Sequence, residues 1–337
     1  MIRSLLPLRA EGVHSRHTAG VGLALAGLLV AGAALAQPRE FPQRPVRIVV
    51  PVPPGGSVDA VSRLLAPKMS ESLGQPVVVD NRAGASTNIG MELVARAPAD
   101  GHTLLANTLP LVANPALFPN LPFDAVKSFA PISLVVNGPS LIVAHPSVPA
   151  RDLRELLALA RAKPGALRYS SSGAGTLTHL GAELFLFRTG TRIVHVPYKG
   201  GGPALAAAVS GECDLSFQTP LAAAGQVAAG RLRALAVTSR SRLPLLPEVP
   251  TAAEAGVPDF EFQSWVGLLA PAGTPAGIVR TLNEHVVRAA RSPEVADRFM
   301  RDGAEVIAST PEQFARLIAT DIALWSKVIR EMGIRAD

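Results

Sequence analysis

Two glycine-rich segments carry residue types suited to holding a small anion. Pro51–Asp59 reads Pro-Val-Pro-Pro-Gly-Gly-Ser-Val-Asp, and Ser170–His179 reads Ser-Ser-Ser-Gly-Ala-Gly-Thr-Leu-Thr-His. Glycines let the backbone approach a ligand, and hydroxyl groups donate hydrogen bonds to carboxylate oxygens. Where such a turn leads into a helix, unpaired N–H groups and the positive end of the helix dipole face the same point. The sequence therefore predicts two anion-binding turns.

Within the turns, hydroxyl groups are the first candidates for ligand contact. Ser57 follows two glycines and can cap a helix or donate to a carboxylate. Around Gly173 and Gly175, the second turn has the hydroxyl groups of Ser171, Ser172 and Thr176. The alternative is that both segments are only structural links between a strand and a helix.

The charged and aromatic neighbours of the turns allow a structural and a functional interpretation. For Asp59 we expect stabilisation of the first loop, and for His179 a hydrogen bond to the second loop, more than ligand contact. Lys199 either supplies charge to the site or is an exposed turn lysine. Tyr198, which lies beside glycines, is a candidate wall or lid of a cleft.

The elements that must position these turns alternate between strands and helices. Short apolar runs such as Val46–Val50 precede amphipathic segments, a pattern typical of parallel sheets with helices on both faces. The pattern restarts after Asn137–Pro139 and changes again near Trp265. We expect residues 37–140 and 265–337 to form one lobe and residues 141–264 to form a second, inserted lobe. Two crossovers of this kind imply a hinge.

The N-terminal segment resembles an export signal. Arg3, Arg9 and Arg16 precede an apolar stretch over residues 19–35, which ends in a small-x-small sequence. We predict a signal peptide over residues 1–36 that is cleaved after Ala36, and hence a periplasmic protein. The alternative is a membrane anchor, which the short Gly/Ala-rich stretch does not favour.

Composition and motifs exclude several classes of protein. The formal charge of +6 falls to +4 without the three arginines and one glutamate of residues 1–36. The sequence contains no cluster of basic residues of the kind that binds nucleic acid, so nucleic-acid binding is not expected. Cys213 is the only cysteine, so an internal disulfide is excluded and we expect a buried side chain there. His-Glu-x-x-His, Cys-x-x-Cys, Walker and Gly-x-Ser-x-Gly motifs are absent from the sequence. We predict no metal site, no cofactor and no enzymatic activity.

Short motifs in a fixed order resemble one family, the periplasmic solute receptors of tripartite tricarboxylate transporters, often called Bug-type receptors. The resemblance runs from about Phe41 to the C-terminus, and its specificity lies in the joint order of the motifs. The motifs are the two turns together with Val77–Ala85, Asn88–Gly90, Ala99–Leu105, His195–Gly201, Arg233–Thr238, Pro247–Thr251, Glu254–Gly256 and Trp265–Pro275.

The resemblance implies an α/β periplasmic-binding-protein (Venus-flytrap) fold, with two doubly wound lobes joined by a hinge. It implies a small organic carboxylate held by backbone amides, hydroxyl groups and ordered waters, and a monomer that delivers its ligand to membrane permease subunits. The ligand-binding residues predicted from the turns and the resemblance together are Val52, Pro53, Gly56, Ser57, Thr108, Ser171, Ser172, Gly175, Thr176, Tyr198, Gln218 and Thr219.

At several positions the sequence departs from the family pattern. Ser86 stands where glycine is frequent, and Val52 and Val266 stand where an aromatic residue is common. Gln218 replaces a common aspartate, which favours a ligand without an amino group. Two other functions stay open from the sequence: a ligand-loaded sensor that presents a carboxylate to a membrane sensor kinase, and an exported serine hydrolase.

Overall fold

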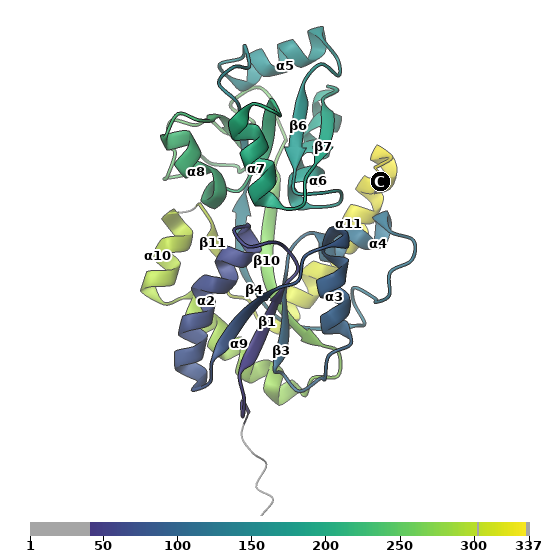
Figure 1. The fold of residues 1–337 in the computed structure, drawn as a ribbon, viewed down its shortest axis with the longest axis vertical. Helices are drawn as coiled ribbons and strands as arrows, with labels where there is room; N and C mark the ends of the chain where they lie inside the picture. The colour runs from purple at the N-terminus through teal and green to yellow at the C-terminus, as the bar shows by residue number, and fades with distance from the viewer. Residues whose placement is uncertain (1–40, 302, 335–337) are drawn as a thin grey trace, which may run out of the picture. The chain divides into compact units, whose positions relative to one another are not determined.

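The computed structural model describes residues 41–301 and 303–334, so the predicted signal peptide lies outside the described residues. All helices and strands described lie in the compact unit Arg44–Asp337. This unit contains two β-sheets with helices packed around each of them (Figure 1).

The first sheet takes its strands from both ends of this unit. Its six strands run in the order β11-β4-β10-β3-β1-β2. Their bounds are β1 (Val46–Val50), β2 (Val77–Asn81), β3 (Thr103–Asn107), β4 (Phe129–Pro139), β10 (Gln263–Pro271) and β11 (Glu305–Val306).

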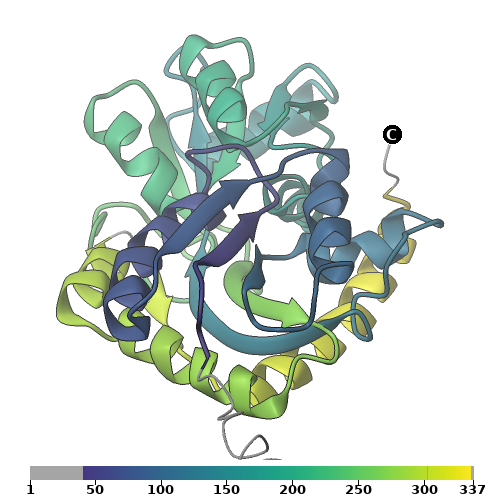
Figure 2. The same ribbon diagram turned by 60° about the horizontal axis from the view of Figure 1, so that its bottom comes forward.

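The helices of the first lobe cover both faces of this sheet. In Figure 2, α2 and α9 lie on one side of the sheet, and α3 and α11 lie on the other. The helices of this lobe are α2 (Ser57–Leu73), α3 (Asn88–Ala95), α4 (Pro110–Leu117), α9 (Ala276–Ala290), α10 (Pro293–Arg301) and α11 (Pro311–Met332), with a short 3₁₀ segment, η1, at Ala85–Thr87.

The second sheet is formed by the middle of the chain. Its order is β7-β6-β8-β5-β9, with β5 (Leu141–Ala144), β6 (Arg168–Ser171), β7 (Val194–Pro197), β8 (Leu215–Gln218) and β9 (Arg233–Val237). Its helices are α5 (Leu153–Ala162), α6 (Leu177–Thr189), α7 (Gly201–Ser210) and α8 (Pro220–Ala228).

The buried strand β5 shows how this second lobe is packed. Ile142 joins the apolar cluster that contains the buried leucines of α5 and α6, whereas Leu141 and Val143 join the cluster that contains Ala208 of α7 and Ala223 of α8. Alternate side chains of a strand point to opposite faces, so helices cover both faces of this sheet as well. The structure confirms the expected two-lobe α/β fold.

The prediction of parallel sheets is only partly correct. β1 pairs in parallel with β2 and β3, and β6 with β7 and β8. β10, in contrast, is antiparallel to β3 and β4, and β5 is antiparallel to β8 and β9. The reason is the direction of the crossing strands: β5 and β10 begin where the chain passes from one sheet to the other, whereas the strands beside them end there.

Thr238 joins the two segments that cross between the sheets. Its hydroxyl group accepts the Ser140 N–H (2.8 Å) and donates to the Phe262 carbonyl (2.5 Å), and its backbone pairs with both residues. The side chain of Thr238 is fully buried, so these hydrogen bonds are shielded from water. The role of this crossing as a hinge stays a prediction, and so do the predicted lobe boundaries at residues 140/141 and 264/265.

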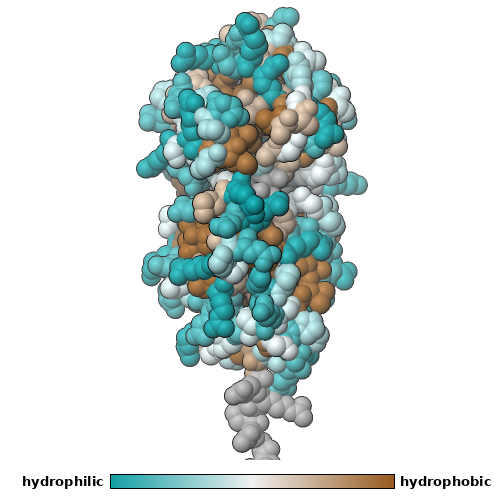
Figure 3. Space-filling model, turned by 90° about the vertical axis from the view of Figure 1, so that its left-hand side faces the viewer, coloured by the Kyte–Doolittle hydropathy of each residue, from teal (hydrophilic) through white to brown (hydrophobic). Residues whose placement is uncertain are grey.

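The surface shows no broad apolar region on the face seen in Figure 3. There, hydrophobic residues form small separate groups among hydrophilic ones. Among the described helices, none combines the length and the apolar character needed to cross a membrane.

Candidate functional site

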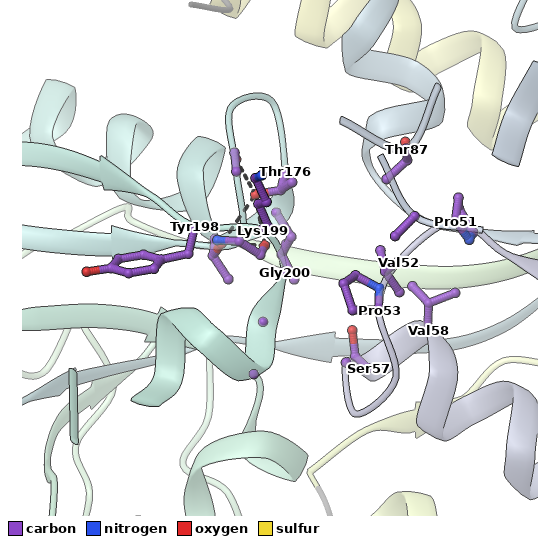
Figure 4. A pocket seen from close by; sticks show the side chains of 18 of the residues that line it. Pro51, Val52, Pro53, Ser57, Val58, Thr87, Thr176, Tyr198, Lys199 and Gly200 are labelled. Atoms are coloured by element: carbon purple, nitrogen blue, oxygen red, sulfur yellow. Dashed lines mark hydrogen bonds between the residues drawn. The ribbon is translucent and has the colours of Figure 1, made fainter. Parts of the chain in front are cut away.

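A cavity of about 750 Å³ lies between the turns of the two lobes. Ten of the twelve residues predicted to bind a ligand line this cavity (Figure 4). They are Val52, Pro53, Gly56, Ser57, Thr108, Ser172, Thr176, Tyr198, Gln218 and Thr219. The structure thus brings residues far apart in the sequence to one site, and their contact with a ligand stays a prediction.

The first turn connects β1 to α2 and is fixed by hydrogen bonds to Asp59 and Asn81. Gly55 has a φ of +91°, which a glycine adopts without strain, and its N–H donates to Asp59 Oδ2 (3.0 Å). Asn81 donates to Asp59 Oδ1 (2.9 Å) and to the Val52 carbonyl (3.0 Å). The expectation that Asp59 stabilises this loop is confirmed.

Asp59 is held as a carboxylate although it is 3% exposed. Burial alone would raise the pKa of Asp59, but hydrogen bonds from Arg63, the Gly55 amide and Asn81 outweigh it and lower this pKa below its ordinary value. The Arg63 Nε lies 3.0 Å from both carboxylate oxygens. The guanidinium group of Arg63 therefore neutralises the negative charge of Asp59 beside the first turn.

The second turn connects β6 to α6 and carries a network of hydroxyl groups. Ser172 Oγ donates to Thr176 Oγ1 (3.0 Å) and lies 2.8 Å from Thr178 Oγ1. Thr176 Oγ1 in turn donates to the Gly173 carbonyl (2.6 Å). All four residues line the cavity, so this wall offers several hydroxyl groups in fixed positions.

Two predicted contacts, Ser171 and Gly175, do not line the cavity but lie behind its wall. Ser171 is fully buried, and its Oγ accepts the Gly173 N–H (3.1 Å) and lies 2.6 Å from His195 Nε2. Gly175 donates its N–H to His179 Nδ1 (3.0 Å), which confirms the expected hydrogen bond from this histidine to the loop. The sequence predicted their turn correctly but not which residues face inward.

The histidines beneath the second turn form an aromatic stack. The rings of His179 and His195 are 4.1 Å apart between centroids, and Tyr169 stacks on His195 at 4.9 Å. Burial, together with the neighbouring His195, lowers the pKa of His179 to about 3. His179 is therefore neutral at ordinary pH and accepts a hydrogen bond at Nδ1.

Tyr198 lines the cavity, which agrees with its interpretation as a wall, but the direction of its side chain does not agree with the interpretation as a lid. In Figure 4 its ring points away from Pro53 and Ser57, and its hydroxyl group lies 3.7 Å from Cys213 Sγ. The neighbouring Gly200 instead brings the second lobe against the first: a Cβ built on it would lie 2.7 Å from Pro53 Cγ. Cys213 is buried, as predicted.

The segment Ala83–Thr87 forms a further wall of the cavity and is not among the residues predicted to bind a ligand. Ala85, Ser86 and Thr87 all have φ between +44° and +76°, a region that is unfavourable for residues other than glycine. Asn114 of α4 holds this loop by donating to the Ser86 carbonyl (2.8 Å). The signal in the sequence was the departure from glycine at Ser86.

The cavity is surrounded by the beginnings of helices. The first residues of α2, α4, α6 and α7 line it, and so does Thr219, which directly precedes α8. Among the described residues of the lining, none is an aspartate, glutamate, arginine or histidine, and Lys199 is the one ionisable cation. Several positive helix ends, with no acidic side chain among the described lining residues, favour an anionic ligand.

The geometry does not favour catalysis or metal binding. The pair of Ser171 and His195 resembles a nucleophile with its base, but the serine is fully buried and does not line the cavity, so a substrate would not reach its hydroxyl group. No cluster of three or more His, Cys, Asp or Glu side chains suited to a metal ion occurs in the described part of the chain.

Proteins similar to this chain include a named relative and two solved structures with bound carboxylic acids. Protein BugT of Bordetella pertussis is 38% identical over 318 residues, which cover 93% of this chain and 98% of BugT. R. palustris Rpa4515, solved with adipate, is 38% identical with a TM-score of 0.84, covering 88% of this chain and 99% of that one. MatC from Rhodopseudomonas palustris, solved with bound malate, is 35% identical with a TM-score of 0.81, covering 86% and 100%.

Residues 61–334 match the family described as tripartite tricarboxylate transporter family receptor. This match spans most of the chain, and it agrees with the two-lobe fold and with the motifs in their order. The chain therefore belongs to the family of tripartite tricarboxylate transporter receptors, which are solute-binding proteins.

Proposed function

We propose that this protein is an exported periplasmic receptor that binds a small organic carboxylate between its two lobes and delivers it to a tripartite tricarboxylate-type membrane transporter. The observation that carries the proposal is the convergence of helix N-termini on a cavity whose described lining residues include no acidic side chain. Such an environment compensates a negative charge through N–H groups and dipoles. No catalytic step is part of this function.

The matched arrangement of α2 and α6 favours a ligand with two acidic groups. Gly56–Val58 at the start of α2 and Thr176–Thr178 at the start of α6 line the cavity from the two lobes. Each helix can hold one carboxylate, and Val52, Pro53 and Leu205 offer apolar surface for the carbon chain between them. Relatives solved with adipate and malate support this class of ligand.

The composition of the lining also disfavours a ligand that carries an amino group. No aspartate or glutamate is among the described lining residues, and Gln218, which is 2% exposed, donates its amide N–H to Ser216 (2.7 Å). An ammonium group would therefore lose its water without gaining a carboxylate partner.

A thermal-shift screen of the mature protein tests the proposal. The panel contains malate, succinate, adipate and benzoate, with glutamate, glucose and magnesium chloride as comparisons. A ligand at 100 times its Kd adds about 2.7 kcal/mol to the free energy of unfolding. Stabilisation by one or more acids supports the proposal, whereas a clear shift with glucose or magnesium and none with any acid would contradict it.

A further inference from the structure

The two turns are fixed by the same arrangement of atoms. In α2 the N-cap is Gly56, and the residue before it, Gly55, donates its N–H to the third helical residue, Asp59. In α6 the N-cap is Thr176, and Gly175 donates in the same way to the third helical residue, His179.

The backbone conformations of the two turns also agree. Gly55 and Gly175 have φ values of +91° and +73°. The N-caps Gly56 and Thr176 are both extended, with φ, ψ of −81°, 168° and −78°, 167°, and neither makes a side-chain cap hydrogen bond. The first-turn N–H groups of both helices are therefore left without the partner that a capping side chain normally provides.

We propose that Asp59 and His179 are paired positioning residues, each of which orients one half of the ligand site by accepting the N–H of the glycine four residues before it. By turning the Gly55 and Gly175 amides away from the cavity, they present the following residues, Gly56–Val58 and Thr176–Thr178, to it. This inference rests on the proposed function, because the oriented groups are those that would hold the carboxylates.

The two acceptors differ in charge, and their surroundings account for the difference. Asp59 is an anion close to an anion site, which is tolerable because the Arg63 guanidinium contacts both of its oxygens at 3.0 Å. His179 accepts through Nδ1 only while it is unprotonated, and its stack with His195 and its burial keep it neutral. Both acceptors thus fix a glycine without adding uncompensated charge to the cavity.

The experiment compares variants that keep or delete the acceptor. His179→Asn carries an amide oxygen close to the position of Nδ1, whereas His179→Leu has no acceptor. Asp59→Leu has no side-chain acceptor, so that the Gly55 N–H and the Asn81 amide both lose their partner. Amide hydrogen exchange is measured on the unliganded proteins, and affinity for the best acid of the panel is measured by calorimetry.

We expect His179→Leu to speed exchange in segment 173–176 at least about tenfold and to weaken acid binding by a similar factor, since a buried N–H loses its acceptor. Segment 55–58 should stay unchanged. Asp59→Leu should show the reverse pattern, and His179→Asn should behave like the wild type.

Equal effects of His179→Leu and His179→Asn, or unchanged exchange in segment 173–176 of His179→Leu, would overturn the inference. If His179→Leu does not fold, Asp59→Leu decides by the same criterion in segment 55–58. A wild-type protein that binds no acid would refute the proposed function. Hydrogen exchange is measured without a ligand, so the exchange pattern would still test the positioning role.

Discussion

Substitution of Gly200 by alanine should specifically disturb the contact between the lobes. A Cβ on Gly200 would lie 2.7 and 2.9 Å from Pro53 Cγ and Cδ, and the φ of Gly200 is +116°. Pro53 is a rigid ring on the opposite lobe, so the added methyl group has to be accommodated by moving the lobes apart.

The substitution has two effects that can be measured separately. The unfavourable φ costs about 1–3 kcal/mol in any arrangement of the lobes and therefore lowers the Tm of the unliganded protein. The clash with Pro53 exists only when the lobes touch, and overpacking of this kind costs about 1–3 kcal/mol. We therefore expect ligand affinity to fall by a factor of about 5 to 150.

Gly202→Ala is the matched control. This glycine is the second residue of α7, two positions after Gly200, and it also lines the cavity. A Cβ built on it meets no atom within 4 Å. Within α7 the change should stabilise the helix by up to about 1 kcal/mol and leave affinity unchanged.

The assay combines unfolding of the unliganded proteins with calorimetric titration of the acid. Small-angle scattering with and without the acid then shows whether the ligand-induced compaction is reduced in Gly200→Ala. A Gly200→Ala protein that binds like Gly202→Ala, or that shows only a lower Tm, would refute the claim that the approach of Gly200 to Pro53 contributes to binding.

Three further substitutions and conditions test other parts of the structure. Thr176→Val keeps the shape of the second turn but removes a hydroxyl group, and we expect affinity to fall by about 1–3 kcal/mol in calorimetry. Thr238→Val leaves the Ser140 N–H and the Phe262 carbonyl unpaired, which should lower the free energy of unfolding in urea by about 2–5 kcal/mol. For His179, the folded pKa of about 3 lies below the ordinary 6.5, so the unfolded chain binds a proton that the folded one does not. Stability should therefore fall by about 2 kcal/mol between pH 7 and pH 5, and His179→Asn should lack this loss.

The sequence predicted the turns well because their chemistry is local. Glycines with positive φ, hydroxyl groups and a helix start lie within ten residues in each case, so spacing alone indicates the geometry. It also predicted the loop-fixing roles of Asp59 and His179, since a side chain in the first turn of a helix lies within hydrogen-bond reach of the residues just before the helix.

The sequence could not indicate which residues of a turn face inward. Ser171 lies behind the cavity wall, where its hydroxyl group contacts His195 of β7, a residue 24 positions later in the sequence. Gly175 lies there too, because its N–H donates to His179. The direction of Tyr198 depends likewise on Cys213, fifteen residues later. The antiparallel pairing of β5 and β10 follows from the points at which the chain crosses between the sheets. An apolar run in the sequence predicts a strand but not its direction relative to its neighbours.

Neither half of this site is a strong anion site by itself. A charge at one exposed helix N-terminus gains only about 0.3–1 kcal/mol, because water screens it. The same N–H groups act more strongly once water is excluded, and that requires the second turn to lie against the first, as Gly200 lies against Pro53. A ligand shifts the proposed closure only through contacts that exist in the closed arrangement. Affinity should therefore depend on both turns together, and a monocarboxylate that reaches only Gly56–Val58 should bind far more weakly than a dicarboxylate of the same length.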